Sequence, residues 1–165
     1  MLVRDAARSD AASLCAFAVA LFEERLPVLY TRNAPPTVDQ QIAFIDEMAT
    51  PRSKLFVAMS PDARVIGMLD FHGEQRAEAA HGGQLGMSVA HGFRGCGVGR
   101  RLLEALFAWA PDAGISRIEL QVFATNAIAV GLYEGCGFEH EGRRRKAVRT
   151  VLGDVDVLLM GKLFD

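Results

Sequence analysis

The stretch from Met87 to Leu103 carries the residues that best suit chemistry with an anion. Three glycines stand at alternate positions before and within the start of a predicted amphipathic helix: Gly95, Gly97 and Gly99. Three arginines lie in the same stretch: Arg94, Arg100 and Arg101. Glycines at a helix start leave backbone N–H groups uncovered, and the positive end of the helix dipole points to the same place. The stretch therefore predicts an anion site.

Other anion-binding loops fit this stretch less well. The phosphate loop of nucleotide triphosphatases needs a Lys-Ser or Lys-Thr pair after its last glycine, and none follows here. In the dinucleotide pattern G-x-G-x-x-G, Gly95 and Gly97 fit the first two places, but Arg100 occupies the third. A tight turn, in which the glycines only allow close packing of the backbone, is the simpler alternative. The density of glycines and arginines argues against it.

The elements around this loop follow from hydrophobic periodicity and turn signals. Strands are predicted over residues 2–5, 54–59, 64–71, 84–89, 117–123, from 138 onward and over 154–164. Helices are predicted to begin at Ser9 or Asp10, at the T-x-x-Q capping box of Thr37, at Val98 and at Asn126. The strand–helix–strand unit in the middle should be parallel, because its crossover helix returns the chain to the same sheet edge. We expect an α/β fold with a mixed, mostly antiparallel sheet, a central parallel βαβ unit and helices on both faces.

Composition narrows the class of protein. The chain of 165 residues suits one domain, residues 1–165, with half of its residues hydrophobic and a formal net charge of −2. This balance excludes a disordered chain and a strongly basic one, so we expect no nucleic-acid partner. Three scattered cysteines without a C-x-x-C pair suggest reduced thiols, and no apolar stretch suits a signal peptide or a membrane span. We predict a cytoplasmic protein without a membrane partner, and we expect no metal.

A longer pattern connects the loop to residues downstream. Arg94-x-x-Gly97-x-Gly99 resembles the Q/R-x-x-G-x-G/A signature of the GNAT superfamily of acyl-CoA N-acyltransferases. Asn126 follows Gly99 by 27 residues, and the segment 132–138, LYEGCGF, is similar to the family's LYEKxGF. The match covers roughly residues 84–160, whereas the first 80 residues agree only in element order. The resemblance implies a GNAT-like fold and acetyl-CoA (coenzyme A) as co-substrate.

The resemblance also implies roles for individual residues. The coenzyme pyrophosphate would be held by the glycine loop: Arg94, Gly95, Cys96, Gly97, Val98, Gly99 and Arg100. Side chains at Gly97 and Gly99 would block approach of the backbone to the coenzyme. The backbone of Met87, Ser88 and Val89 would pair with the pantetheine arm, and an amide near Met87 would polarise the thioester carbonyl. Asn126 would contact the arm. It also suits a helix N-cap, and both roles can hold.

Tyr133 resembles the family's general acid. A phenol with a reference pKa of about 10 is protonated at neutral pH and can donate to a leaving thiolate. Its alternative is a packed aromatic side chain on an apolar helix face. A base must also take a proton from the amine, yet Gln121 stands where some family members carry a glutamate. Other acidic or basic side chains fit a solvated surface equally well: Asp70, His72, His81 and Glu119. A chain of water molecules could also take the proton of the amine, and it would leave no signature in the sequence.

The acceptor is less defined by the sequence. The tail from Glu141 to Met160 resembles the E-G-x-x-R…G-x-x-x-D…M ending of GNAT members that acylate small amines, including amino acids, and of some that act on protein N-termini. The basic run 143–146 suits a carboxylate-bearing substrate or a solvated edge strand. Tyr30, Arg32 and Asn33, in a proline-rich loop, could line the site or be ordinary exposed residues.

We predict an acetyl-CoA-dependent N-acetyltransferase that transfers acetyl to a primary amine, a small molecule such as an amino acid, by direct attack in a ternary complex. Neither Cys96 nor Cys136 is placed as a nucleophile. The alternatives are a protein N-terminal or lysine acetyltransferase and a non-catalytic acyl-CoA-binding sensor. A homodimer is left open.

Overall fold

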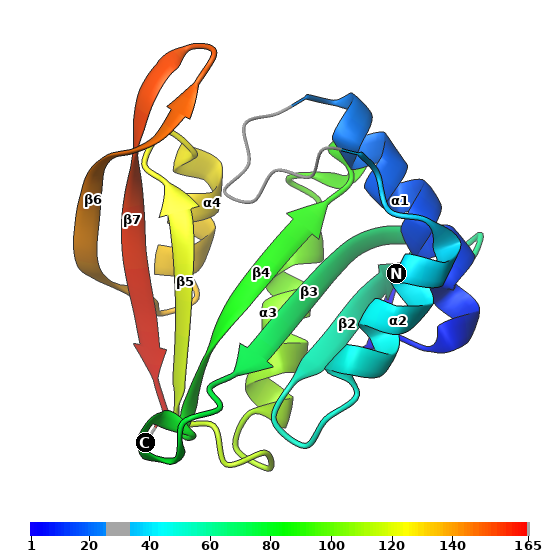
Figure 1. Cartoon of the computed structure of the whole chain (residues 1–165), viewed down its shortest axis with the longest axis horizontal. Coiled ribbons are helices and arrows are strands. Elements are labelled where there is room, and N and C mark those ends of the chain that lie inside the picture. The colour runs from blue at the N-terminus through cyan, green and yellow to red at the C-terminus, as the bar shows by residue number, and fades with distance from the viewer. Residues whose placement is uncertain (26–33, 165) are drawn as a thin grey trace.

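The computed structural model describes residues 1–25 and 34–164, and its core is one mixed sheet (Figure 1). The strand order is β1-β2-β3-β4-β5-β7-β6. The strands are β1 Leu2–Asp5, β2 Lys54–Met59, β3 Val65–Gly73, β4 Gly82–Val89, β5 Arg117–Phe123, β6 Glu139–Thr150 and β7 Gly153–Leu163. The helices are α1 Ala11–Glu23, α2 Val38–Met48, α3 Val98–Trp109 and α4 Ala127–Glu134, with short 3-10 turns at Arg8–Asp10, Ala77–Ala79 and His91–Phe93. This order confirms the predicted succession of strands and helices.

Strands β4 and β5 form the parallel pair of the sheet, and all the other described pairs are antiparallel. The parallel pairing runs only from Gly82 opposite Arg117 to Gln84 opposite Glu119. Beyond that point the two strands diverge, as Figure 1 shows. We call this divergence, formed by residues 85–89 of β4 and 120–123 of β5, the fork. The central βαβ unit is confirmed, and its strands separate beside the glycine loop.

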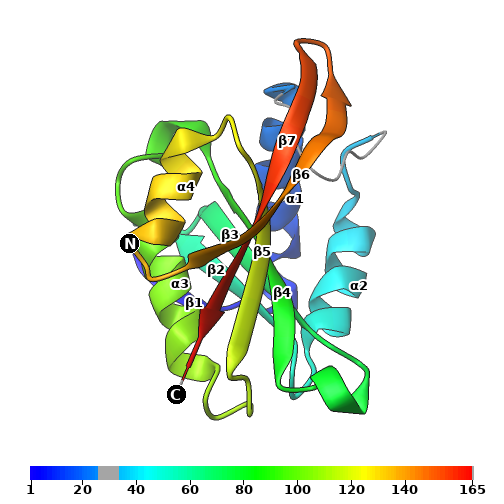
Figure 2. The ribbon, with the colours of Figure 1, turned by 90° about the vertical axis from the view of Figure 1, so that its left-hand side faces the viewer.

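The helices cover the two faces of the sheet in pairs (Figure 2). Helices α3 and α4 lie on one face, where the apolar stripe of α3 is fully buried: Val98, Leu102, Leu103 and Leu106. Helices α1 and α2 pack on the other face over β2 and β3. Removing these apolar side chains from water stabilises the fold by roughly 25 cal/mol per Å². Within the described residues, no helix has both the length and the hydropathy needed to cross a membrane.

Local signals fixed several element ends. The predicted capping box is confirmed, because the Gln40 amide donates to Thr37 Oγ1 at 3.3 Å and the Thr37 amide donates to Gln40 Oε1 at 3.0 Å. Asp10 precedes α1 as predicted, but its carboxylate makes no cap bond there. It accepts instead from both Arg4 Nη atoms and from the Ala7 amide. Tyr30, Arg32 and Asn33 lie outside the described residues.

Candidate active site

The glycine loop presents unpaired backbone donors where α3 begins. Gly95 and Gly97 have φ of +75° and +80°, a conformation that glycine adopts at little cost. The first bond into the helix runs from the Arg101 amide to the Gly97 carbonyl. Several nearby amides donate to no described acceptor: those of Gly95, Gly97, Val98, Gly99 and Arg100. A Cβ at Gly95 or Gly97 would meet nothing within 4 Å. Open space and free N–H groups at a helix start fit a phosphate group.

Gly99 differs from the other two glycines of the loop. It lies inside α3, is buried and has no positive φ. A Cβ there would lie 2.8 Å from Leu132 Cδ2 on α4 and 3.3 Å from Met87 Cε on β4. The absent side chain thus lets α3 approach α4 and β4 closely. The sequence had suggested approach of the coenzyme as the reason for this glycine, whereas the structure shows a packing reason.

The side chain of Arg94 turns away from the free amides. Its Nε donates to the Val89 carbonyl at 3.0 Å, and its Nη2 pairs with Glu24 Oε2 at 2.7 Å. Arg94 therefore ties the glycine loop to the end of β4 and to the residue after α1. A direct contact between Arg94 and a ligand phosphate stays a prediction, as does the corresponding role of Arg100.

One edge of β4 faces the fork with unpaired backbone groups. The Ala90 amide donates to the Ile66 carbonyl of the β3 side. Because antiparallel strands alternate in hydrogen-bonding direction, Ser88 directs its backbone groups at β3, whereas Met87 and Val89 direct theirs at the fork. The Val89 carbonyl is taken by Arg94. The Met87 amide and carbonyl and the Val89 amide thus face the fork, in the arrangement that an extended ligand arm needs. The backbone of Ser88 does not.

Tyr133 lies on α4 and belongs to the buried cluster that also includes the apolar stripe of α3. Asn126 caps this helix, since its side chain accepts from the Ala129 amide at 3.2 Å. Tyr133 is 6% exposed and its ring packs edge-on against Phe138, with 5.6 Å between ring centres. Burial, and then the negative charge of Asp70 and the thiol of Cys136, raise the pKa of Tyr133 to about 12. The hydroxyl stays protonated at neutral pH and donates to no described group.

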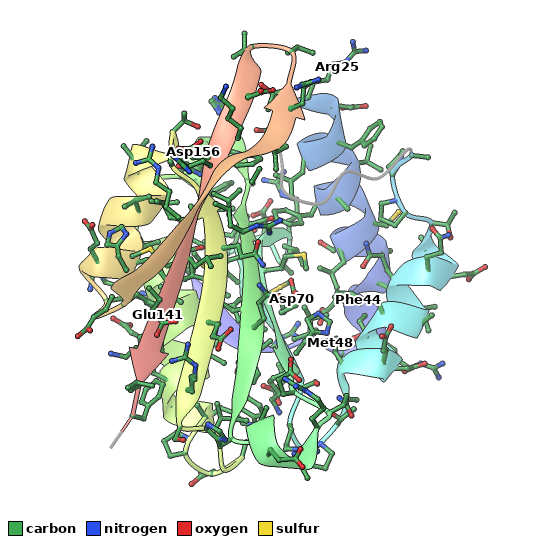
Figure 3. All side chains as sticks on the ribbon, turned by 60° about the vertical axis from the view of Figure 1, so that its left-hand side comes forward. Arg25, Phe44, Met48, Asp70, Glu141 and Asp156 are labelled. Carbon is green, nitrogen blue, oxygen red and sulfur yellow. The ribbon has the colours of Figure 1, made fainter. Side chains whose placement is uncertain are left out.

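The face of the sheet that α1 and α2 share is polar near the fork. Asp70 lies beside α2, near the labelled Phe44 and Met48 (Figure 3). A Cβ on Gly86 would lie 3.0 Å from both Asp70 oxygens, so the carboxylate covers β4 at that point. His72 Nε2 lies 3.1 Å from Asp70 Oδ2. This hydrogen bond raises the pKa of His72, against the opposing effect of burial.

A hollow of about 320 Å³ adjoins this face between β4, β5 and the β6–β7 hairpin. Its lining is Gln84, Glu119, Leu120, Gln121, Glu141, Leu159 and Met160. Arg117 pairs with Glu119 at 2.7 Å and also with Glu141, so these two carboxylates are neutralised. Gln121 Oε1 accepts from Arg144 Nη1 at 3.3 Å. Within residues 1–25 and 34–164, Arg144 pairs with no carboxylate.

The structure therefore gathers most of the predicted residues around the fork, and it adds two that the sequence did not single out as partners. Arg144 belongs to the basic run 143–146, and its contact with Gln121 joins residues 23 positions apart. Glu24 had no assigned role. Its position 70 residues before Arg94 gives no local signal. Among the described residues, no cluster of His, Cys, Asp and Glu is arranged to hold a metal ion.

Two curated N-acetyltransferases are similar to part of this chain. A [ribosomal protein bS18]-alanine N-acetyltransferase from Salmonella typhimurium is 36% identical over 74 residues, which are 45% of this chain and 50% of that protein. The L-amino acid N-acetyltransferase AaaT of Escherichia coli is 33% identical over 86 residues, which are 52% of this chain and 53% of that protein. The chain thus spans about half the length of the curated relatives it matches.

The likeness extends over the whole fold. An acetyltransferase of the GNAT family from Streptococcus pneumoniae superposes with a TM-score of 0.91 at 28% identity, covering 99% of both chains. The model of the acetyltransferase (GNAT) family matches residues 18–138. This span includes the glycine loop, the fork and Tyr133, and the chain therefore belongs to the acetyltransferase (GNAT) family.

Proposed function

We propose that the protein is an N-acetyltransferase that takes acetyl from acetyl-CoA and transfers it to a small primary amine such as an amino acid. The observation that carries this proposal is the continuity of three features along β4. Free amides lie at the start of α3, the Met87 and Val89 edge faces the fork, and Tyr133 of α4 belongs to the buried cluster against which Met87 packs. Together they suit a long ligand with phosphates at one end and a reacting group at the other.

In this proposal, some residues bind acetyl-CoA and others transfer protons. The amides from Gly95 to Arg100 would bind the pyrophosphate, and the β4 edge would hold the arm as an added strand. Acetyl-CoA supplies the activated acetyl thioester. The Met87 amide would donate a hydrogen bond to the carbonyl oxygen, which gains charge as the amine attacks directly. Tyr133 would donate its proton to the departing sulfur. Asn126 would hold α4 and contact the arm.

An amino-acid acceptor is supported by charges on opposite sides of the fork. Asp70 is level with Gly86 on β4, and Gln121, two residues beyond the last parallel pair, holds Arg144 on the other side. A guanidinium without a carboxylate partner suits the carboxylate of a substrate. AaaT, by its name, acts on L-amino acids. The other relative, by its name, acts on an alanine of a ribosomal protein, which favours a protein N-terminus as the second candidate.

A panel of acceptors tests the proposal. Purified protein and acetyl-CoA are mixed with amino acids, polyamines, aminoglycosides and N-terminal peptides, and thiol release is followed. We expect turnover with one or more amino acids. If no acceptor of the panel is turned over although calorimetry shows tight acetyl-CoA binding, the proposed enzymatic function is overturned and a non-catalytic acyl-CoA sensor is favoured. Turnover with peptides alone would favour the second candidate.

Arg144→Gln separates a substrate carboxylate site from a solvated edge. It should raise KM for the amino acid about tenfold or more, because a charge-assisted hydrogen bond is lost, and leave KM for acetyl-CoA unchanged. Arg145→Gln is the matched control, because successive side chains of a strand point to opposite faces. Equal effects of the two variants would contradict a specific role for Arg144.

A further inference from the structure

The proposed reaction lacks an assigned base, because an ammonium ion must lose a proton before it can attack. Gln121 cannot accept that proton. The charge of Glu119 is compensated by Arg117, and His81 precedes Gly82, at the end of the parallel pairs that lies away from the fork. Asp70 of β3 lies opposite Gly86 of β4, one residue before Met87, whose backbone faces the fork.

Asp70 is placed at the fork by its cross-strand partner. Its pair on β4 is Gly86, the residue before Met87, and the absence of a side chain at Gly86 lets the carboxylate lie over the β4 backbone. The side chain is 21% exposed, so a substrate can reach it while bulk water is partly excluded. Within the described part of the chain, no lysine or arginine pairs with Asp70. The carboxylate is therefore available to a cationic substrate.

Asp70 also influences Tyr133 from the other face of the sheet. Its charge is the second cause, after burial, of the raised pKa of the Tyr133 hydroxyl. Tyr133 belongs to the buried cluster that includes Leu69 and Leu85, which precede Asp70 on β3 and Gly86 on β4. A carboxylate and a protonated phenol thus approach the same short stretch of β4 from opposite faces. This is the relation that a proton acceptor and a proton donor need in acyl transfer.

His72 connects Asp70 to solvent. Its Nε2 contacts Asp70, and its side chain is 50% exposed. The charged groups that face the ring are Asp70 on its own strand and Glu47 on α2, while Phe44 of α2 lies 6.4 Å from it and Gln84 is its pair on β4. Lys54, on β2, lies over Trp109 and pairs with Asp5 instead. Both carboxylates favour the imidazolium and raise the pKa of His72, so its ring is suited to receive a proton.

We propose that Asp70 binds the ammonium group of the acceptor and takes its proton, and that His72 passes this proton to water. The inference rests on the proposed function. During the reaction the amine nitrogen loses two protons and forms the new C–N bond to the acetyl carbon, while the C–S bond of the thioester breaks. One proton leaves through Asp70 and His72 to solvent. The other replaces the proton that Tyr133 gives to the sulfur, so the net products are the amide, the free thiol and one proton.

The test compares Asp70→Asn and His72→Gln with wild type over pH 6 to 9.5, using an acceptor found with the panel. We expect Asp70→Asn to lower kcat/KM about a hundredfold at pH 7, the usual range for loss of a general base. The deficit should shrink toward the pKa of the amine, because solvent then supplies the neutral amine. His72→Gln should cause a smaller loss and remove a rise of kcat/KM with pH whose midpoint lies above 6.5.

Controls separate this inference from folding and from the proposed function. Acetyl-CoA affinity and Tm should be unchanged in both variants. His140→Gln breaks a similar pair, His140 Nε2 with Glu134 Oε1 at 2.7 Å, outside the acceptor face and should leave the pH profile unchanged. If wild type turns over the acceptor and kcat/KM of Asp70→Asn equals that of wild type at every pH, the role of Asp70 is overturned and the proposed function is kept. A deficit independent of pH would reduce Asp70 to a structural role.

Discussion

The hydroxyl of Tyr133 is held where it keeps its proton. Its ring is buried against Phe138, and burial is the largest cause of a pKa of about 12. A phenol with this pKa is a weaker acid than free tyrosine and stays protonated throughout the working pH range. A thiolate is a weaker base than the corresponding phenolate, so the amine proton must replace the proton of the phenol as the sulfur departs. The apolar packing and the proposed acid role therefore require the same environment.

Replacement of Tyr133 by phenylalanine tests that role at the residue scale. We expect kcat to fall about a hundredfold and Tm to change little, because the ring packing is retained. In wild type the acid is active while protonated, and the raised pKa moves its deprotonation from about 10 to about 12. Activity should therefore show no tyrosine-dependent decline below about pH 11. A decline near pH 10 in wild type that the variant lacks would contradict the shifted pKa.

At the scale of elements, features set by neighbouring residues could be predicted from the sequence, whereas contacts between distant residues could not. The capping box at Thr37 and the strand over residues 117–123 depend on residues within one turn or one strand, and both were predicted. The Arg94–Glu24 pair joins residues 70 apart, and no local pattern reports it. The position of Asp70 over Gly86 depends on cross-strand register, which the tertiary fold sets. The fork likewise arises because β4 and β5 stop pairing after Gln84, although both strands continue.

Helix α4 offers a test that separates capping from ligand contact at Asn126. Aspartate keeps an oxygen that can accept from the Ala129 amide, but it loses the amide donor of asparagine. Asn126→Asp should therefore keep Tm and weaken acetyl-CoA binding. Asn126→Ala should lose both, with a stability cost of about 1 kcal/mol.

Thermal unfolding and calorimetric titration of the two Asn126 variants check this expectation. If acetyl-CoA affinity is unchanged in both, Asn126 is only a helix cap. If the aspartate variant is destabilised as much as the alanine variant, the cap bond is not what holds the start of α4.

At the scale of the molecule, the sheet consists of two parts that diverge on one side of a shared core. Strands β1 to β4 and strands β5, β7 and β6 meet in three parallel pairs. A single hydrophobic cluster under α3 includes Leu69 and Leu85 from one part and Leu120 and Met160 from the other. Apolar packing on the α3 face therefore holds the parts together. The opposite face stays polar at the fork, and under the proposed function substrates would enter there.

This division predicts where acetyl-CoA will stabilise the protein. A ligand arm that pairs with the β4 edge would protect the amides of Met87 and Val89 from hydrogen exchange, whereas the Ser88 amide, bonded to β3, should change less. Amides from Gly97 to Arg100 should also be protected, because they have no described protein acceptor. At an acetyl-CoA concentration of 100 times Kd, binding should add about 2.7 kcal/mol to the free energy of unfolding, which corresponds to a rise in Tm of roughly 5–10 °C. Exchange measured with and without acetyl-CoA checks the pattern, and desulfo-coenzyme A, which keeps the pyrophosphate, serves as the control for the loop. Equal protection of Met87, Ser88 and Val89 would show that the whole strand is rigidified, and it would contradict pairing along one edge.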